Sequence, residues 1–341
     1  MRLRAPILGL AVLLPYGVGC GSASFSKVNQ EDTRQLTRVT DAQSGRAANS
    51  IVVSDLSGHI RVIDPYGTVK RRWSIESAIS KLAVSGDGRL VAAGDIAGRI
   101  LIIDVEDGVI TKTFLAHSQA IRGIAFASPS SLVTTVGNGV VVWDLEKLKP
   151  KRTIHNPSQH CLIGSFEGNP VFAASIWRSF ACTTPQVSAM DVSPDGTLLA
   201  VAVYRRVIVL RISDGRTLNE VEAYASSLAF SPKGEQLAIG LRSGRIELCD
   251  WKQGQITKAW PAHESSSIAA LSYAPDGMLL ASTSFNGDVA VFDTATGAIR
   301  TRIKAGQEAA RLAWFPGPQA RKLFIGTANG QLLVSGCGLG E

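Results

Sequence analysis

The feature that most constrains this chain is an apolar segment that recurs at nearly constant spacing. Seven such segments each end in an aspartate or in a residue that takes its place, and their last residues are Asp64, Asp104, Asp144, Arg211, Asp250, Asp293 and Gly336. Successive ends lie 40, 40, 67, 39, 43 and 43 residues apart. Repeats of about 40 to 45 residues are typical of four-stranded propeller blades. The spacing therefore predicts a β-propeller.

Turn sequences divide each repeat into short strands. Pairs such as Ser57-Gly58 and Asn286-Gly287 precede the recurring segment, and Gly and Asn tolerate the positive φ of tight hairpins. Pro194-Asp195-Gly196 marks a second turn one strand earlier. The chain is 45% hydrophobic and 18% charged and has 33 glycines, which fits an all-β protein with many turns. We expect seven four-stranded antiparallel blades.

The last strand of the repeat is nearly duplicated. Ile110–His117 reads Ile-Thr-Lys-Thr-Phe-Leu-Ala-His, and Ile256–His263 reads Ile-Thr-Lys-Ala-Trp-Pro-Ala-His, 146 residues later. Two segments this similar and this far apart indicate an internal repeat.

These residues resemble the WD40-repeat β-propeller family. Trp143-Asp144 matches its signature dipeptide, and His117 and His263 match the histidine of its Gly-His pair. The resemblance covers about residues 50–341 and gives these four residues structural roles. It also implies a hydrogen-bonded tetrad of His, Ser or Thr, Asp and Trp. Its partial remnant here is expected to consist of His263, Ser284, Asn286 and, in the Trp position, Phe292.

The spacing of 67 residues predicts an irregular insertion near 155–186 within a propeller that spans 34–341. The excess over one repeat is too short for a whole blade, although an eroded eighth blade stays open. Arg34–Thr40 reads as a strand that could complete either the first or the last blade. Such pairing across the seam would remove two exposed sheet edges.

The amino terminus has the pattern of an export signal. Arg2 and Arg4 precede an apolar run, and Cys20 closes the segment in a way that resembles a bacterial lipoprotein signal, although Gly17 stands where that family prefers Leu. We expect residues 1–19 to be a signal peptide, Cys20 to be lipidated and 20–33 to form a tether. The protein would then be an exported, membrane-anchored lipoprotein of the cell envelope, on the periplasmic side or the outer membrane. Cleaved export without a lipid, or a plain apolar start, stays open.

Sequence motifs of catalysis and cofactor binding are absent. No phosphate-binding loop, nucleophile elbow or Cys-x-x-Cys pair occurs in the chain. His155, His160 and Cys161 cluster, but no fourth metal ligand is placed beside them. A net charge of +7 without a basic cluster interleaved with aromatics does not suggest nucleic-acid binding. We expect no enzyme activity, no cofactor, no metal and no nucleic acid.

The insertion carries the candidate partner-binding residues. Trp177, Arg178 and Phe180 have no counterpart in the repeats, and aromatic residues beside Arg are favoured binding anchors. Local packing is the alternative role for them. Cys161 and Cys182 are candidates for a disulfide that would fix this loop, and two free thiols are the alternative.

The sequence thus favours a noncatalytic scaffold that binds other proteins and is held to a membrane by its lipid. Some propellers are lactonases or quinone-cofactor dehydrogenases, with ligands that converge on the central channel. We expect few inward polar residues here, judging from the third strand of each repeat, which argues against such an enzyme. A component of outer-membrane protein assembly is the other alternative.

Overall fold

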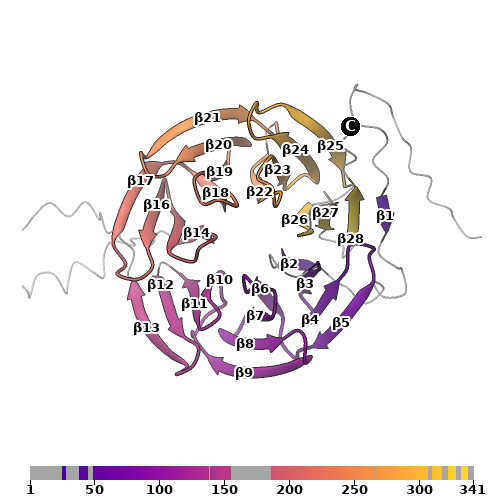
Figure 1. Ribbon diagram of the computed structural model, residues 1–341, viewed down its shortest axis with the longest axis vertical. Coiled ribbons are helices and arrows are strands. Elements are labelled where there is room, and N and C mark those ends of the chain that lie inside the picture. The colour runs from indigo at the N-terminus through magenta and orange to yellow at the C-terminus, as the bar shows by residue number, and fades with distance from the viewer. Residues whose placement is uncertain are drawn as a thin grey trace, which may run out of the picture.

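The computed structural model describes residues 25–27, 38–44, 49–137, 139–154, 186–264, 266–305, 309–316, 322–327 and 332–336. These residues form seven four-stranded antiparallel sheets arranged radially around a central channel (Figure 1). The prediction of a seven-bladed, all-β propeller is confirmed. Within the described ranges, no helix is long and apolar enough to cross a membrane.

Each blade is numbered in chain order, and its strands run from the channel to the rim. Blades 1 to 4 are β2 (Val39–Ser44), β3 (Ile51–Asp55), β4 (His59–Ile63), β5 (Val69–Ser74); β6 (Ile79–Val84), β7 (Leu90–Asp95), β8 (Arg99–Asp104), β9 (Val109–Leu115); β10 (Gly123–Ser128), β11 (Ser131–Val136), β12 (Gly139–Asp144), β13 (Lys149–Ile154); and β14 (Val187–Val192), β15 (Leu198–Val203), β16 (Arg206–Arg211), β17 (Thr217–Glu222). Blades 5 to 7 are β18 (Ala225–Phe230), β19 (Leu237–Leu241), β20 (Arg245–Asp250), β21 (Gln255–Pro261); β22 (Ile268–Tyr273), β23 (Leu279–Ser284), β24 (Asp288–Asp293), β25 (Ile299–Lys304); and β26 (Ala309–Trp314), β27 (Lys322–Thr327), β28 (Leu332–Gly336), β1 (Phe25–Lys27).

The apolar pattern of the strands follows from their position in a blade. All six residues of β15 and of β23 are buried, because neighbouring blades cover both faces of a second strand. A strand buried on both faces is apolar along its whole length instead of at every other residue. The rim strand β13 is Lys-Pro-Lys-Arg-Thr-Ile and is mostly exposed. The sequence of each strand therefore encodes its distance from the channel.

The hydrophobic core is divided into seven clusters, and each lies between two adjacent blades. One cluster joins Val133 of blade 3 to Val187 and Leu199 of blade 4. These two blades therefore pack directly on each other on either side of residues 155–185, so no eighth blade stands between them. Another cluster joins Val53 of blade 1 to Phe324 of blade 7 and closes the ring.

The seam of the ring is completed by the amino-terminal part of the chain. β1 pairs antiparallel with β28, with Phe25 opposite Ser335, and supplies the outermost strand of blade 7. β1 lies within the stretch interpreted from the sequence as a tether. Of the strand expected over 34–40, the described part begins at Arg38, and β2 from Val39 onward forms the innermost strand of blade 1.

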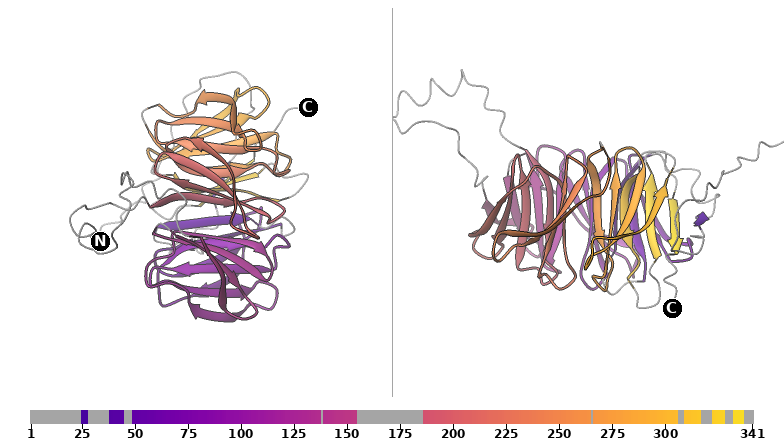
Figure 2. Two further views of the ribbon diagram at one scale, coloured as in Figure 1. Left: turned by 90° about the vertical axis from the view of Figure 1, so that its left-hand side faces the viewer. Right: turned by 90° about the horizontal axis from the view of Figure 1, so that it is seen from above.

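One face of the disc carries the described turns between the second and third strands of the blades, and we call it the turn face. Strand direction alternates within a blade, so the connections from each rim strand to the next blade lie on the same face (Figure 2). In blade 2, Gly98 has φ +84°, and a Cβ there would lie 2.1 Å from the carbonyl oxygen of His117. The backbone amides of Ala116 and His117 both donate to the Gly98 carbonyl, so this turn needs glycine and fixes the connection beside it.

Candidate functional site

Several residues singled out from the sequence lie outside the described residues. They are Cys20, His155, His160, Cys161, Trp177, Arg178, Phe180 and Cys182. The lipid anchor, the disulfide and the partner-binding role of the insertion therefore remain predictions.

His117, Thr134 and Trp143 join blade 2 to blade 3 through a hydrogen-bonded chain. Trp143 Nε1 donates to Thr134 Oγ1 at 2.9 Å, and His117 Nε2 lies 2.8 Å from the same oxygen. Thr134 and Trp143 are buried, and burial lowers the pKa of His117. This arrangement satisfies buried polar atoms between blades and leaves none of the three groups directed at a ligand.

His263 joins blade 5 to blade 6 in the equivalent way. Its Nε2 lies 2.8 Å from Ser282 Oγ, so the expected pairing with Ser284 is wrong. Ser284 instead donates to the side-chain oxygen of Asn286 within its own turn. Ser282 and Ser284 are two residues apart on β23, so their side chains share a face and only the structure distinguishes them. Burial lowers the pKa of His263 to about 4.

The aspartates that end the third strands hold turns. Both Glu146 and Lys147 donate their backbone amides to Asp144 Oδ1 at 3.0 Å, and the Lys147 bond is the main cause that lowers the pKa of Asp144. Cys249 is buried in a core strand, and burial raises its thiol pKa to about 11. The described residues include no group of three or more His, Cys, Asp or Glu that could hold a metal ion.

Exposed apolar side chains recur on the turn face. The first turn residue after the second strand is Leu56, Ile96, Tyr204 and Phe285 in blades 1, 2, 4 and 6, and 47% to 62% of each is exposed. In blade 1 the buried carboxylate of Asp55 accepts the backbone amides of Ser57 and His59, each at 2.9 Å. A turn pinned from inside in this way holds its apolar tip outward in water.

Tyr204 is the most unusual of these side chains because its backbone is in the left-handed region, with φ 54°. Aromatic residues rarely adopt this conformation, and such strain concentrates at functional sites. The Tyr204 ring contacts Tyr224 edge to face, with centroids 6.2 Å apart, and the guanidinium of Arg242 lies 4.5 Å from the Tyr224 centroid. Tyr204, Tyr224 and Arg242 form an exposed cluster between blades 4 and 5, which we call the tyrosine cluster.

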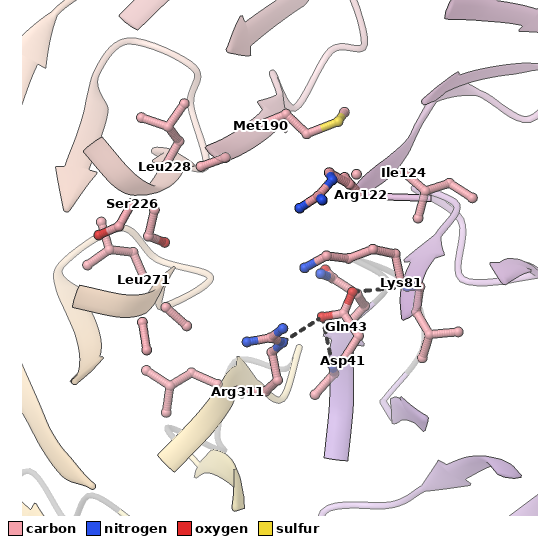
Figure 3. A pocket seen from close by; sticks show the side chains of 18 of the residues that line it. Asp41, Gln43, Lys81, Arg122, Ile124, Met190, Ser226, Leu228, Leu271 and Arg311 are labelled. Carbon is pink, nitrogen blue, oxygen red and sulfur yellow. Dashed lines mark hydrogen bonds and ion pairs between the residues drawn. The ribbon is translucent and has the colours of Figure 1, made fainter. Parts of the chain in front are cut away.

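The central channel is lined by the innermost strands of all seven blades, and its described lining residues include three cations and one carboxylate. Lys81, Arg122 and Arg311 point toward the same space, and Asp41 lies beside them (Figure 3). The expectation of few inward polar residues is therefore wrong. It was drawn from the third strands, whereas the first strand of each blade faces the channel.

The charged channel residues lie close to the turn face. In the strand register, Asp41 lies opposite Ser54 and Lys81 lies opposite Gly94. Ser54 and Gly94 are each one residue before the end of the second strand. Arg311 likewise pairs with Gly326, next to the last residue of β27. The exposed apolar turns thus surround a channel mouth that carries excess positive charge.

Comparisons with known proteins agree with this architecture. A family model described as the anaphase-promoting complex subunit 4 WD40 domain matches residues 206–266 and 256–316. Actin-interacting protein 1 of Caenorhabditis elegans is 22% identical over 253 residues, which cover 72% of this chain and 38% of the relative. Serine-threonine kinase receptor-associated protein of Gallus gallus is 22% identical over 228 residues, which cover 60% of this chain and 63% of the relative. Telomerase protein component 1 of Rattus norvegicus is 24% identical over 217 residues, which cover 55% of this chain and 8% of the relative.

The match spans less than two thirds of each of these eukaryotic relatives, so it concerns a part of each and not its whole length. The repeat spacing, the four-stranded blades and the His117–Thr134–Trp143 chain are those expected of one family. The matches and the architecture together support the WD40-repeat β-propeller family for this chain.

Proposed function

We propose that this protein is a noncatalytic scaffold that binds a partner protein through the turn face. The observation that carries the proposal is the exposed apolar residue at the same turn position of four blades, Leu56, Ile96, Tyr204 and Phe285. Turn tips are usually polar, and apolar side chains gathered on one face of a soluble fold are typical of interaction sites.

The tyrosine cluster is the expected anchor of this interface. Tyr and Arg are enriched among residues that dominate binding energy, and rigid side chains lose little entropy on association. Tyr204 is held by its ring contact with Tyr224, and Arg242 is held over the Tyr224 face. Two of the relatives are named for interaction or association with another protein, actin and a kinase receptor, which supports a protein as the partner.

Site-specific photo-crosslinking tests the proposal. A photoreactive phenylalanine analogue placed at Tyr204 or Phe285 should form a protein adduct in cells. The control position is Met278, which is 60% exposed and lies in the turn between the first and second strands of blade 6, on the opposite face. Equal adducts from Met278, or adducts that nuclease removes, would contradict a protein-binding turn face.

We also propose that the scaffold is exported and held at a membrane through a lipid on Cys20. This rests on the sequence alone, on Arg2 and Arg4, the apolar run after them and the position of Cys20. A thioether-linked lipid would hold the propeller at the membrane by acyl chains and not by a spanning helix. Cys20→Ala should move the protein out of the detergent phase, or leave it uncleaved. Unchanged partitioning of this variant would overturn the anchor without affecting the turn face.

A further inference from the structure

The channel mouth concentrates positive charge that the described residues around it do not neutralise. Lys81, Arg122 and Arg311 come from blades 2, 3 and 7, and Asp41 is the single carboxylate among the described residues that line the channel. Asp41 lies 3.5 Å from Arg311 Nε. No hydrogen bond or ion pair with a described residue holds the side-chain nitrogens of Lys81 or Arg122. Like charges held together in a partly dry cavity repel, so the arrangement is unfavourable unless an anion joins it.

Two of the four charged groups are fixed in place. Arg311 Nε donates to the backbone carbonyl of Thr40 at 2.6 Å. Asp41 accepts the backbone amide of Leu82 at 2.9 Å and that of Ala42 at 3.0 Å. The Arg311 guanidinium is therefore oriented before any ligand arrives, which lowers the entropy lost on binding.

Arg122 occupies a position where other blades use serine for a structural bond. In blades 2, 4 and 5 this serine hydroxyl donates to a backbone carbonyl at the start of the next blade. The pairs are Ser80 to Ile121 at 2.8 Å, Ser188 to Ala225 at 2.9 Å and Ser226 to Ile268 at 2.7 Å. Arg122 directly follows Ile121 and so takes the serine position of blade 3. Blade 3 therefore has an exposed guanidinium in the channel at the position where these three blades have the bridging serine.

The pKa of Lys81 is lowered by the groups around it. The charge of Arg311, and then burial, lower the pKa of Lys81 to about 8, while Asp41 raises it. At pH 7 the ammonium is still mostly charged. Repulsion by Arg311 lowers this pKa, and attraction to a bound anion would raise it.

We propose that the channel mouth is a binding site for an oxyanion, the phosphate or carboxylate group of a ligand, held by Lys81, Arg122 and Arg311. An arginine fork matches two oxygens of such a group, and a lysine adds a point charge. The cavity has about 720 Å³ of open space, including solvent at its mouth, which accommodates a small, multiply charged group. The site is separate from the apolar turns, and it does not require that the turn face binds protein.

Titration calorimetry of the full chain at pH 7 and low salt tests the site with two probes, inorganic pyrophosphate and tricarballylate. Arg122→Ser introduces the residue that blades 2, 4 and 5 carry at this position, so we expect this variant to keep the fold. Arg216→Ser removes an exposed arginine from a turn of blade 4 on the opposite face and serves as the charge-matched control.

We expect at least one probe to bind and Arg122→Ser to weaken it about tenfold or more, with Arg216→Ser within about twofold of the parent. Binding of pyrophosphate alone would assign a phosphate-bearing ligand, tricarballylate alone a carboxylate, and both an oxyanion of either kind. If neither probe binds, or if Arg122→Ser and Arg216→Ser bind like the parent, the proposal is overturned. Either result leaves the crosslinking test of the turn face unaffected.

Discussion

Arg311 in blade 7 donates from Nε to the backbone carbonyl of Thr40 in blade 1 at 2.6 Å, across the seam where the two ends of the propeller meet. At three other blade junctions a serine hydroxyl, one position earlier in the inner strand, makes a similar bond to a backbone carbonyl of the next blade. The seam is therefore closed by a charged side chain that also lines the channel. One residue serves both the ring and the proposed oxyanion site.

Arg311→Met should lower the free energy of unfolding by about 1–3 kcal/mol, because it removes a charge-assisted bond to a backbone carbonyl. Ser226→Ala, which removes a similar but neutral bond, should cost about 1 kcal/mol. Chemical denaturation of both variants checks this order. An Arg311→Met protein as stable as the parent would contradict a stabilising role of Arg311 at the seam. Loss of the Arg311 charge should also raise the pKa of Lys81, which NMR of the lysine side chain can measure.

Oxyanion binding should weaken as the pH rises through about 8. The charged groups that face Lys81 are Asp41 on β2, Arg122 beside β10 and Arg311 on β26, and the pKa of Lys81 is lowered to about 8. A bound anion favours the ammonium, so the apparent pKa should be higher in the complex. In calorimetric titrations, the ratio of the affinity at pH 7 to that at pH 9.5 should be severalfold larger for the parent than for Lys81→Met, and this comparison cancels the ionisation of the probe itself.

Lys81→Met should also stabilise the free protein at pH 7. A lysine whose pKa is lower in the fold than in the unfolded chain opposes folding below its folded pKa, here about 8. Because the side chain is partly solvated, we expect a gain of roughly 1 kcal/mol and not the full value implied by the pKa shift. Thermal unfolding should show a higher Tm for the variant at pH 7 and a smaller difference above pH 10. A lower Tm at pH 7 would show that Lys81 has a structural role.

The junction of blades 2 and 3 and the junction of blades 5 and 6 use the same two aromatic positions with the sizes exchanged. Phe114 contacts Trp143 at a centroid distance of 5.3 Å, whereas Trp260 contacts Phe292 at 5.7 Å. Trp143→Phe alone should cost about 2 kcal/mol, because it leaves space and breaks the bond to Thr134. Adding Phe114→Trp should recover part of this loss. If the free-energy costs of Trp143→Phe and Phe114→Trp simply add in the double mutant, the two positions do not compensate each other in volume and the prediction is wrong.

Stability should fall with pH between 6.5 and about 4 because His263 is held neutral. Its pKa is about 4 in the fold, owing to burial and then to Arg302, against 6.5 for an ordinary histidine. Below pH 6.5 the unfolded chain takes up a proton that the folded chain does not, so the contribution of up to about 3 kcal/mol is lost over this window. His263→Gln should reduce the slope of unfolding free energy against pH. The slope should not vanish, because the pKa of His117 is lowered as well.

The fold could be predicted from the sequence because each blade repeats the same strands and turns, and seven copies reinforce one interpretation. The closing strand β1 could not, because three residues carry no usable pattern. The channel cations were visible in the sequence: Asp41, Lys81 and Arg311 stand where the other inner strands have Gly123, Ala189, Ser227 and Ala270. They were missed because the third strand, and not the first, was taken to face the channel.

The turn face was harder to anticipate. An apolar residue such as Ile96 between Asp95 and Gly98 is visible in the sequence, but its exposure depends on how the carboxylate pins the turn from inside. The conformation of Tyr204 has no sequence signal, since nothing but the register of β15 against β16 forces an aromatic residue into the left-handed region.

Binding by Tyr204→Gly is the most direct test of the turn face as a protein-binding surface. Glycine fits φ 54° without strain, so loss of the contact with Tyr224 and relief of strain should nearly cancel, and the free energy of unfolding should stay within about 1 kcal/mol of the parent. Affinity for the protein captured through this face should fall about tenfold or more, measured by surface plasmon resonance beside the control Met278→Ser. A stable Tyr204→Gly protein that binds this partner as tightly as the parent would contradict the account.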